Sequence, residues 1–296
     1  MRSVLALLLL VALPAQAGTR EERSLLPQQI SSWDERTGLL VASAWGPADI
    51  GRSTVEVTRD GGRTWSVMRA FSSKVEISAV PGTRTAFAAT PTGLFRTRDA
   101  GASWVGISRR ALEKPSFATP LVGWAMELTT IVATRDGGRR WAALRAPCTK
   151  AANIEIALTT AARGWAVCGF RPGAGQQPKE VWSTRDGGAT WRLLNRASPA
   201  GRTVGQGLCV CGYSDGIAMT AGSAGWLWTT RGSFYRTGDG GRTWSSLPIS
   251  SPDLVEGRSA SLVSDRVGYA LFAYRPALRL TRDGGRTWTV VRRWSS

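Results

Sequence analysis

Histidine is absent from the 296-residue chain, and its absence excludes whole classes of enzyme. Without an imidazole there is no Ser-His-Asp triad, no Cys-His nucleophile pair and none of the common histidine-containing zinc sites. Glycoside chemistry remains open, because it needs only two carboxyl groups about 5 to 9.5 Å apart across a substrate cleft. We therefore predict a protein that is not an enzyme and holds no metal or other cofactor, with a carboxylate-only glycosidase as the enzymatic alternative.

Long apolar runs are missing beyond the first residues of the chain. Met1 and Arg2 precede an apolar run at residues 4–13, and Ala15-Gln16-Ala17 then forms the small-residue pattern typical of a signal-peptide cleavage site. A run of about ten residues is too short to anchor a protein in a bilayer. We predict a signal peptide at residues 1–17 and an exported mature chain at 18–296, periplasmic or extracellular and without a transmembrane segment.

Cysteine is scarce, with four residues in the chain. An even number of cysteines in an exported protein predicts disulfides, although their connectivity does not follow from the sequence. A metal site at the Cys-Val-Cys stretch is disfavoured, because no histidine is present to complete it. The candidates for disulfide formation are Cys148, Cys168, Cys209 and Cys211.

Acidic residues are also few: 21 stand against 38 basic ones, which gives a net charge of +17. Such a charge attracts anionic partners. A protein partner is favoured, such as a membrane or envelope complex with an acidic surface; a polysaccharide is an alternative, and export disfavours nucleic acid. Many of the arginines recur within a repeated motif and are therefore spread around the molecule, so an ordinary solvated surface is the competing explanation.

The chain is rich in one repeat. TRDGGRTW stands at 58–65 and again at 281–288, and four looser copies lie between them, with 37 to 53 residues from one aspartate to the next. A period of about 40 to 50 residues predicts one small antiparallel sheet per repeat. Two residues recur in all six copies of the motif: the aspartates are Asp60, Asp99, Asp136, Asp186, Asp239 and Asp283, and the tryptophans are Trp65, Trp104, Trp141, Trp191, Trp244 and Trp288.

The chemistry of the octapeptide suits a turn between two strands. Its aspartate can accept backbone hydrogen bonds, its glycines tolerate positive φ, and its tryptophan begins a strand with a large apolar face. Aromatic runs such as GWAMEL at 123–128 and weaker runs such as NIEIAL at 153–158 supply the other strands of each repeat. Radial closure of such sheets predicts an all-β protein, a single β-propeller of four-stranded antiparallel blades, six in number with seven as the alternative. We also expect residues 18–34 to add a closing strand.

The pattern Ser/Thr-x-Asp-x-Gly-x-x-Trp resembles the Asp-box, or bacterial neuraminidase repeat, of sialidases, sortilin-type receptors, some glycoside hydrolases and photosystem II stability and assembly factors. The pairing of GWA upstream with TRDGGxTW is most similar to the assembly-factor group. The resemblance implies a protein-binding propeller that helps assemble or stabilise an envelope or membrane complex. A sialidase-like hydrolase or a carbohydrate-binding propeller is the alternative, although the Phe-Arg-Ile-Pro signature of sialidases is missing.

The spacing between aromatic strand and octapeptide locates two insertions, at 46–54 and 170–180. Both fall in the loop between the second and third strands, on the face opposite the octapeptides, where loops held by a rigid scaffold often bind ligands. We predict no catalytic residue, and a basic binding surface on this loop face. Its residues are Arg52, Arg109, Arg110, Lys114, Arg171, Lys179, Arg231 and Arg275.

Overall fold

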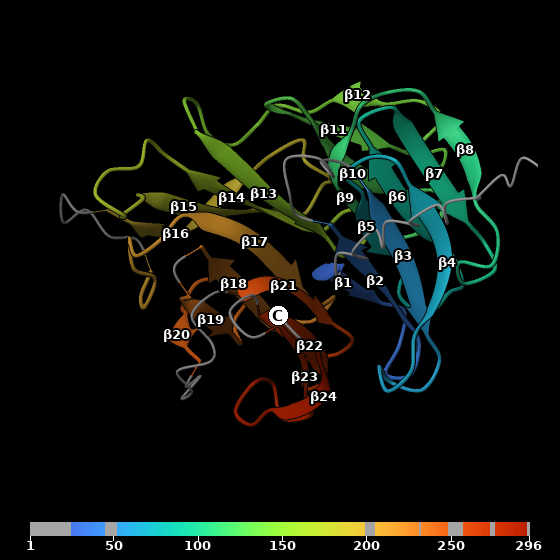
Figure 1. The fold of residues 1–296 in the computed structure, drawn as a ribbon. Helices are drawn as coiled ribbons and strands as arrows, with labels where there is room; N and C mark the ends of the chain where they lie inside the picture. The colour runs from blue at the N-terminus through green and yellow to red at the C-terminus, as the bar shows by residue number, and fades with distance from the viewer. Residues whose placement is uncertain are drawn as a thin grey trace, which may run out of the picture.

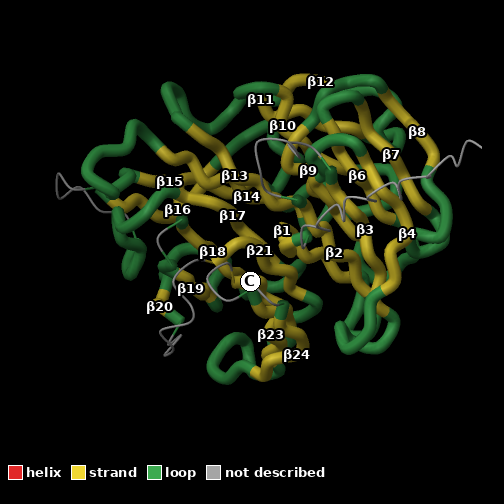
Figure 2. Tube along the Cα trace, in the orientation of Figure 1, coloured by secondary structure: helices red, strands yellow, loops and turns green. Residues whose placement is uncertain are grey.

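The computed structural model describes residues 25–44, 52–198, 205–230, 232–247, 257–272 and 276–294. Within these ranges the chain consists of 24 strands joined by loops (Figure 2). No helix long and apolar enough to cross a membrane occurs in this part of the chain. The predicted signal peptide at 1–17, most of the insertion at 46–54, Arg231 and Arg275 lie outside the described residues.

The strands form six four-stranded antiparallel sheets, each with its strands in chain order. The first three sheets contain β1 (Leu26–Ser32), β2 (Gly38–Ser43), β3 (Ser53–Thr58), β4 (Ser66–Phe71), β5 (Glu76–Ala79), β6 (Ala86–Thr90), β7 (Gly93–Thr97), β8 (Val105–Ser108), β9 (Glu113–Phe117), β10 (Gly123–Glu127), β11 (Thr130–Thr134) and β12 (Ala142–Ala143). The last three contain β13 (Asn153–Leu158), β14 (Gly164–Gly169), β15 (Lys179–Thr184), β16 (Arg192–Ala197), β17 (Ser214–Met219), β18 (Gly225–Thr229), β19 (Phe234–Thr237), β20 (Ser245–Ser246), β21 (Gly257–Leu262), β22 (Gly268–Phe272), β23 (Ala277–Thr281) and β24 (Thr289–Arg293).

The sheets are arranged as blades around a central axis, with the first strand of each innermost and the fourth at the rim (Figure 1). The colours of Figure 1 run around the ring, so that the blue first blade lies beside the red sixth blade. The protein is therefore an all-β propeller of six blades, which confirms the predicted fold.

Among the described residues, the ring closes without an additional strand. Strand β1 pairs along its length with β2 and is the innermost strand of blade one. Blade six contacts it through side chains: Ile30 N donates to Ser259 Oγ at 3.1 Å, and Ser32 N donates to Ser261 Oγ at 2.9 Å. The expected extra closing strand at 18–34 is thus wrong, because the described part of this segment completes the first blade.

The octapeptides form the turns between the third and fourth strands. In the first, Gly62 N donates to Thr58 Oγ1 at 2.8 Å, Thr58 Oγ1 donates to Asp60 Oδ1 at 2.9 Å, and Asp60 also accepts bonds from the backbone and hydroxyl of Thr64. The glycine–threonine–aspartate chain of bonds recurs in the other five turns. These bonds lower the aspartate pKa, to about 2 for Asp60, where the hydroxyl of Thr64 has the largest effect.

Each octapeptide also contacts the turn between the first two strands of its own blade. Gly61 N donates to Arg36 O at 2.8 Å, and an equivalent bond occurs in the other five blades. All six octapeptides consequently lie on one face of the propeller. The loops between second and third strands lie on the opposite face, as do the connections from one blade to the next. In the connection from blade four to blade five, however, Gln206 reaches the octapeptide of blade five, where its carbonyl oxygen accepts from Trp244 N at 3.0 Å.

Large aromatic side chains fill the space between blades. Trp124, Trp165 and Trp226 are nearly inaccessible to solvent. A Cβ added at Gly164 would lie 2.3 Å from the ring of Trp124, and one at Gly268 would lie 2.5 Å from Trp226. At these two interfaces the glycine that begins an aromatic strand makes room for the tryptophan of the preceding blade. Elsewhere it makes room for a first-strand side chain of its own blade, as Gly123 does for Phe117.

Candidate functional site

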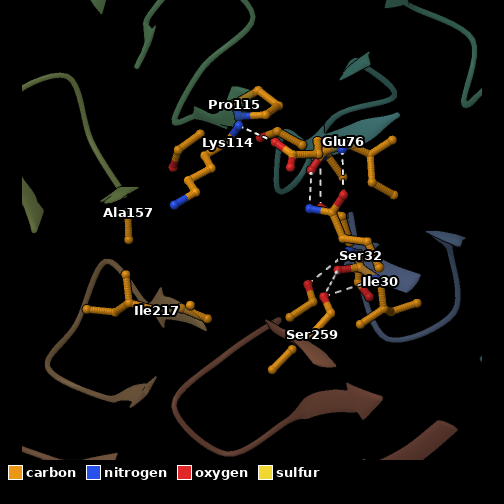
Figure 3. A pocket seen from close by; sticks show the side chains of 18 of the residues that line it. Ile30, Ser32, Glu76, Lys114, Pro115, Ala157, Ile217 and Ser259 are labelled. Carbon is orange, nitrogen blue, oxygen red and sulfur yellow. Dashed lines mark hydrogen bonds between the residues drawn. The ribbon is translucent and has the colours of Figure 1, made fainter. Parts of the chain in front are cut away.

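A cavity of about 1180 Å³ lies on the propeller axis, lined by the innermost strands of all six blades (Figure 3). The edges of these strands face it, so their backbone groups need partners from neighbouring side chains, water or a ligand. At some blade interfaces a serine side chain supplies such a partner, and at others the equivalent residue does not. This difference around the ring defines the candidate site.

Serine side chains join adjacent innermost strands at four of the six blade interfaces. Each hydroxyl accepts a hydrogen bond from a backbone N–H of the next blade, over distances of 2.8 to 3.0 Å. We call these four residues the serine latches, and they are Ser31, Ser78, Ser116 and Ser261, which bind the N–H groups of Ala79, Phe117, Leu158 and Ser32, respectively. Beside one latch, Gln29 forms two further bonds to Ile77, with its Oε1 accepting from the N–H at 2.7 Å.

The remaining two interfaces, on either side of β17, carry alanine at the latch position. The latch position is the one that pairs with the residue after the strand-opening glycine, as Ser31 pairs with Leu39 and Ser261 with Tyr269. At the two remaining interfaces this position is occupied by Ala157, which pairs with Trp165, and by Ala218, which pairs with Trp226. An alanine side chain has no hydrogen-bonding atom. Figure 3 shows dashed bonds around Ser32, Ser259 and Glu76, and none between Ala157 and Ile217.

Strand β17 also has an unusual residue, Gly216, two positions before Ala218. A Cβ at Gly216 would lie 2.0 Å from the ring of Trp228, which lines the cavity. The indole Nε1 of Trp228 is buried and has no hydrogen-bond partner among the described residues. We call Ala157, Gly216, Ala218 and Trp228 the unlatched sector; it combines an open strand edge with an unsatisfied donor.

Charged groups gather at the loop-face end of the cavity. Glu76 accepts bonds from Lys74 Nζ, at 2.7 Å, and from the backbone N–H of Lys114. The ammonium of Lys114 donates to Glu155 Oε1 at 2.6 Å and to Ile154 O at 3.0 Å. Burial raises the pKa of Glu155, although Lys114 acts in the opposite direction, and the nearby Asp215 raises it further. Glu76 and Glu155 are thus each paired with a lysine.

The structure distributes the predicted basic residues over several environments. Arg52 and Lys114 both line the cavity, whereas Arg109 and Arg171 are exposed elsewhere on the loop face.

Two further members of the predicted basic set are occupied by contacts within the protein. Arg110 is paired with Glu127, with 2.7 Å between Nε and Oε1. Lys179 is fully buried rather than surface-exposed, because its ammonium donates to the carbonyl oxygens of Cys209, Cys211 and Gly212. A single continuous basic surface therefore does not form from the described members of the set.

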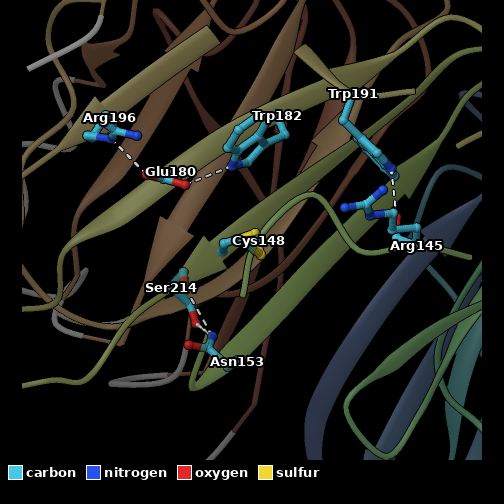
Figure 4. Close-up of a disulfide and its surroundings, with 9 residues drawn as sticks. Arg145, Cys148, Asn153, Glu180, Trp182, Trp191, Arg196 and Ser214 are labelled. Atoms are coloured by element: carbon cyan, nitrogen blue, oxygen red, sulfur yellow. Dashed lines mark hydrogen bonds and ion pairs between the residues drawn. A yellow bond between two sulfur atoms is a disulfide. The ribbon is translucent and has the colours of Figure 1, made fainter. Parts of the chain in front are cut away.

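All four cysteines form disulfides, as predicted. Cys148 is bonded to Cys168, which is buried in β14 (Figure 4), and Cys209 is bonded to Cys211 two residues further on. The first bond ties the connection between blades three and four to the second strand of blade four. The second closes a very small loop on the loop face, beside the insertion of blade four.

Among the acidic residues of the loop face, Glu127 and Glu180 are each bound by an arginine. Glu127 is bound by Arg110, and Glu180 accepts bonds from Arg196 Nε at 2.7 Å and Trp182 Nε1 at 2.9 Å (Figure 4). Asp49 lies outside the described residues. The carboxylates that do line the cavity are others, Glu76, Glu155 and Asp215.

No protein-family model matches the chain, and no curated protein sequence does. Among solved structures, "YCF48 bound to D1 peptide" is similar over 88% of this chain and 94% of that one, with 17% identity and a TM-score of 0.54. A GH74 xyloglucanase from Xanthomonas campestris is 14% identical, with a TM-score of 0.57, over 89% of this chain, which spans 47% of the enzyme. An α-L-arabinanase from Penicillium chrysogenum, complexed with arabinobiose, is 11% identical over 91% of this chain and 94% of that one, with a TM-score of 0.58. These similarities establish the shared propeller fold.

Proposed function

We propose that the protein is an exported, non-enzymatic propeller that binds an extended segment of another protein in its central cavity, and so helps to assemble or stabilise an envelope or membrane complex. The observation that carries this proposal is the unlatched sector, where alanine replaces the serine latch on both sides of β17. At the start of β17, Asn153 Nδ2 still donates to Ser214 O at 2.8 Å, so the open positions lie further along the strand. An extended peptide can supply the missing backbone partners by pairing with an open strand edge.

The register identifies the backbone groups that such a segment would bind. Each serine latch binds the N–H of the residue that opposes a strand-opening position, such as Leu158 opposite Gly164. The equivalent groups are the N–H of Met219, opposite Gly225, and of Leu262, opposite Gly268. Both follow an interface where alanine replaces the latch. A carbonyl oxygen of a bound segment would take the place of the serine hydroxyl at each.

The walls of the cavity indicate the chemistry of the segment. Around β17 they are apolar, with Ile217, Met219 and Trp228. At the loop-face end Lys74 and Lys114 are paired with Glu76 and Glu155, and the exposed Arg52 adds a positive charge. An apolar segment with an acidic flank matches both parts. The net charge of +17 would also accelerate the encounter with an acidic partner, and we propose that exposed Arg109 and Arg171 contribute to this steering. A peptide is the class of ligand recorded for the similar propeller described as "YCF48 bound to D1 peptide".

A glycoside hydrolase is the second candidate, and the observation in its favour is the presence of Glu155 and Asp215 on one cavity wall. Burial raises the pKa of Glu155 and the charge of Asp215 adds to this effect, as a general acid requires. The ion pair of Glu155 with Lys114 disfavours this role, because the lysine occupies the carboxylate that would protonate the leaving group. Hydrolysis of arabino- or xylo-oligosaccharides that is lost in Glu155→Gln would favour the enzyme over the binding protein.

The test uses peptides selected from a random library on the immobilised mature chain and then measured by fluorescence anisotropy. Ala157→Ser and Ala218→Ser, combined, would close both open interfaces, and we expect at least a tenfold loss of affinity, about 1.4 kcal/mol. Ala102→Ser, on the octapeptide face, is the matched control. Unchanged affinity in the doubly latched variant would place the ligand elsewhere. Capture from the native envelope fraction with both variants then identifies the physiological partner.

A further inference from the structure

The Cys209–Cys211 disulfide differs from the other disulfide in its surroundings. Cys211 is exposed and Cys209 is half-buried, whereas Cys168 of the other pair is inaccessible to solvent. A disulfide that closes a loop of three residues constrains the unfolded chain far less than one between residues 20 apart, as in Cys148–Cys168. Stabilisation of the fold is therefore a weak explanation for the smaller ring.

The backbone of this loop is held in place without the sulfur–sulfur bond. Gln177 N donates to Val210 O at 2.7 Å, and Gly212 N donates to Gly175 O at 3.1 Å. Lys179 Nζ adds bonds of 3.1 to 3.3 Å to the carbonyl oxygens of Cys209, Cys211 and Gly212. The two sulfurs would consequently remain close to each other after the bond is opened.

The electrostatic surroundings favour a thiolate at Cys209. The backbone N–H of Cys211 points to Cys209 Sγ at 2.8 Å. Lys179 is fully buried, and burial lowers its pKa to about 8, so most of the ammonium is still charged at neutral pH. Its three bonds go to neutral carbonyls, which leave its positive charge uncompensated. Donated hydrogen bonds and a nearby cation stabilise a thiolate.

We propose that Cys209 and Cys211 form a thiol–disulfide exchange site whose substrates are dithiols of partly folded or extended polypeptides. A substrate thiolate attacks the exposed Cys211 Sγ, the Cys209–Cys211 bond breaks, and its electron pair remains on Cys209 as the stabilised thiolate. The second substrate thiolate then attacks the substrate sulfur of this mixed disulfide, and Cys211 leaves as a thiolate. The substrate is oxidised by two electrons and both cysteines are reduced. Of the two protons released by the substrate thiols, Cys211 takes up one and solvent the other, because Cys209 remains a thiolate. A low-molecular-weight disulfide then reoxidises the pair.

The experiment follows oxidation of a synthetic peptide with two cysteines by the oxidised mature chain, using a fluorescent label that is quenched when the peptide disulfide forms. We expect stoichiometric oxidation by the native protein and none by the Cys209→Ser/Cys211→Ser variant. Alkylation and mass spectrometry in a glutathione buffer should show Cys209 and Cys211 reduced while Cys148–Cys168 stays closed. Equal resistance of both disulfides, or equal peptide oxidation by the double variant, would refute the proposal.

The role of the buried lysine has its own control. Lys179→Met should slow the reaction at least tenfold, whereas Lys150→Met, at an exposed lysine, should leave the rate unchanged. If Lys179→Met does not fold, the double cysteine variant decides the question alone. Latching the cavity with Ala157→Ser and Ala218→Ser should leave the exchange rate unchanged, so this proposal and the peptide-binding proposal can fail separately.

Discussion

The latched and unlatched sides of the central cavity are built from the same repeat and differ at a few side chains. From β21 through β1 and β5 to β9, a serine of one blade satisfies a backbone N–H of the next. Around β17 the serine is replaced by Ala157 and Ala218, and Gly216 leaves room for Trp228. The comparison shows that a repeat protein can form a binding site where two repeats lack a hydrogen-bonding side chain that the others have. The missing partner leaves a strand edge available to a ligand.

Lowering the pH should destabilise the protein more than any of the substitutions below. It should affect the latched and unlatched sides of the cavity equally. Hydrogen bonds from Thr64 and Ser103 lower the folded-state pKa values of Asp60 and Asp99 to about 2. A depressed pKa contributes stability above the unfolded-state value, near 4, and this contribution is lost as the pH falls through 2. We expect thermal denaturation midpoints to fall steeply from pH 4 to pH 2. Hydrogen exchange that detects early opening of one sector alone would contradict a shared role of the turns.

Removing one serine latch should lower the free energy of unfolding by more than adding one raises it. Ser78→Ala leaves the buried N–H of Phe117 without its 3.0 Å partner, so we expect the free energy of unfolding to fall by about 1 to 3 kcal/mol. Urea denaturation measures the change. Ser72→Ala, at an exposed serine of the connection that leads into the same blade, should be neutral. Equal stability of the two variants would show that water replaces the latch without cost.

Adding a latch should make the unlatched side resemble the other. In Ala218→Ser the new hydroxyl is placed, by register, to accept from Leu262 N, as Ser261 accepts from Ser32 N. We expect the free energy of unfolding to rise by about 0.5 to 1.5 kcal/mol, together with slower exchange of the Leu262 amide. Destabilisation would mean that the added oxygen finds no donor at this interface.

The smallest effect concerns an irregularity on the latched side. Ala100 occupies the first glycine position of its octapeptide, with a φ of 57° where Gly61 has 78°. Ala100→Gly removes the steric cost of this conformation but gives the unfolded chain more freedom, so we expect a net gain of only about 0.5 kcal/mol. Gly61→Ala should destabilise in the same assay. A loss of stability in Ala100→Gly would show that the alanine methyl contributes through packing.

The fold followed from the sequence because its determinants recur. An aspartate, a glycine and a tryptophan at fixed spacing predict the same turn six times, and the structure contains each of these turns. The site was harder to predict because it rests on departures from the repeat within its least regular strands. NIEIAL was identified as a strand, but only the alignment of Ala157 with Ser31 through their partner residues reveals a missing hydroxyl. The burial of Lys179 depends on a loop from the next blade, which local sequence does not indicate.

The closure of the ring between β1 and β21 has a mechanical consequence. Every strand of blades one and six belongs to its own sheet, and the bonds across the seam, such as those of Ser259 and Ser261, involve side chains. A pulling force applied to the two ends of the chain would therefore part these blades without unzipping a sheet. In a propeller whose last blade borrows a strand from the other end of the chain, a whole ladder of backbone bonds would have to break first.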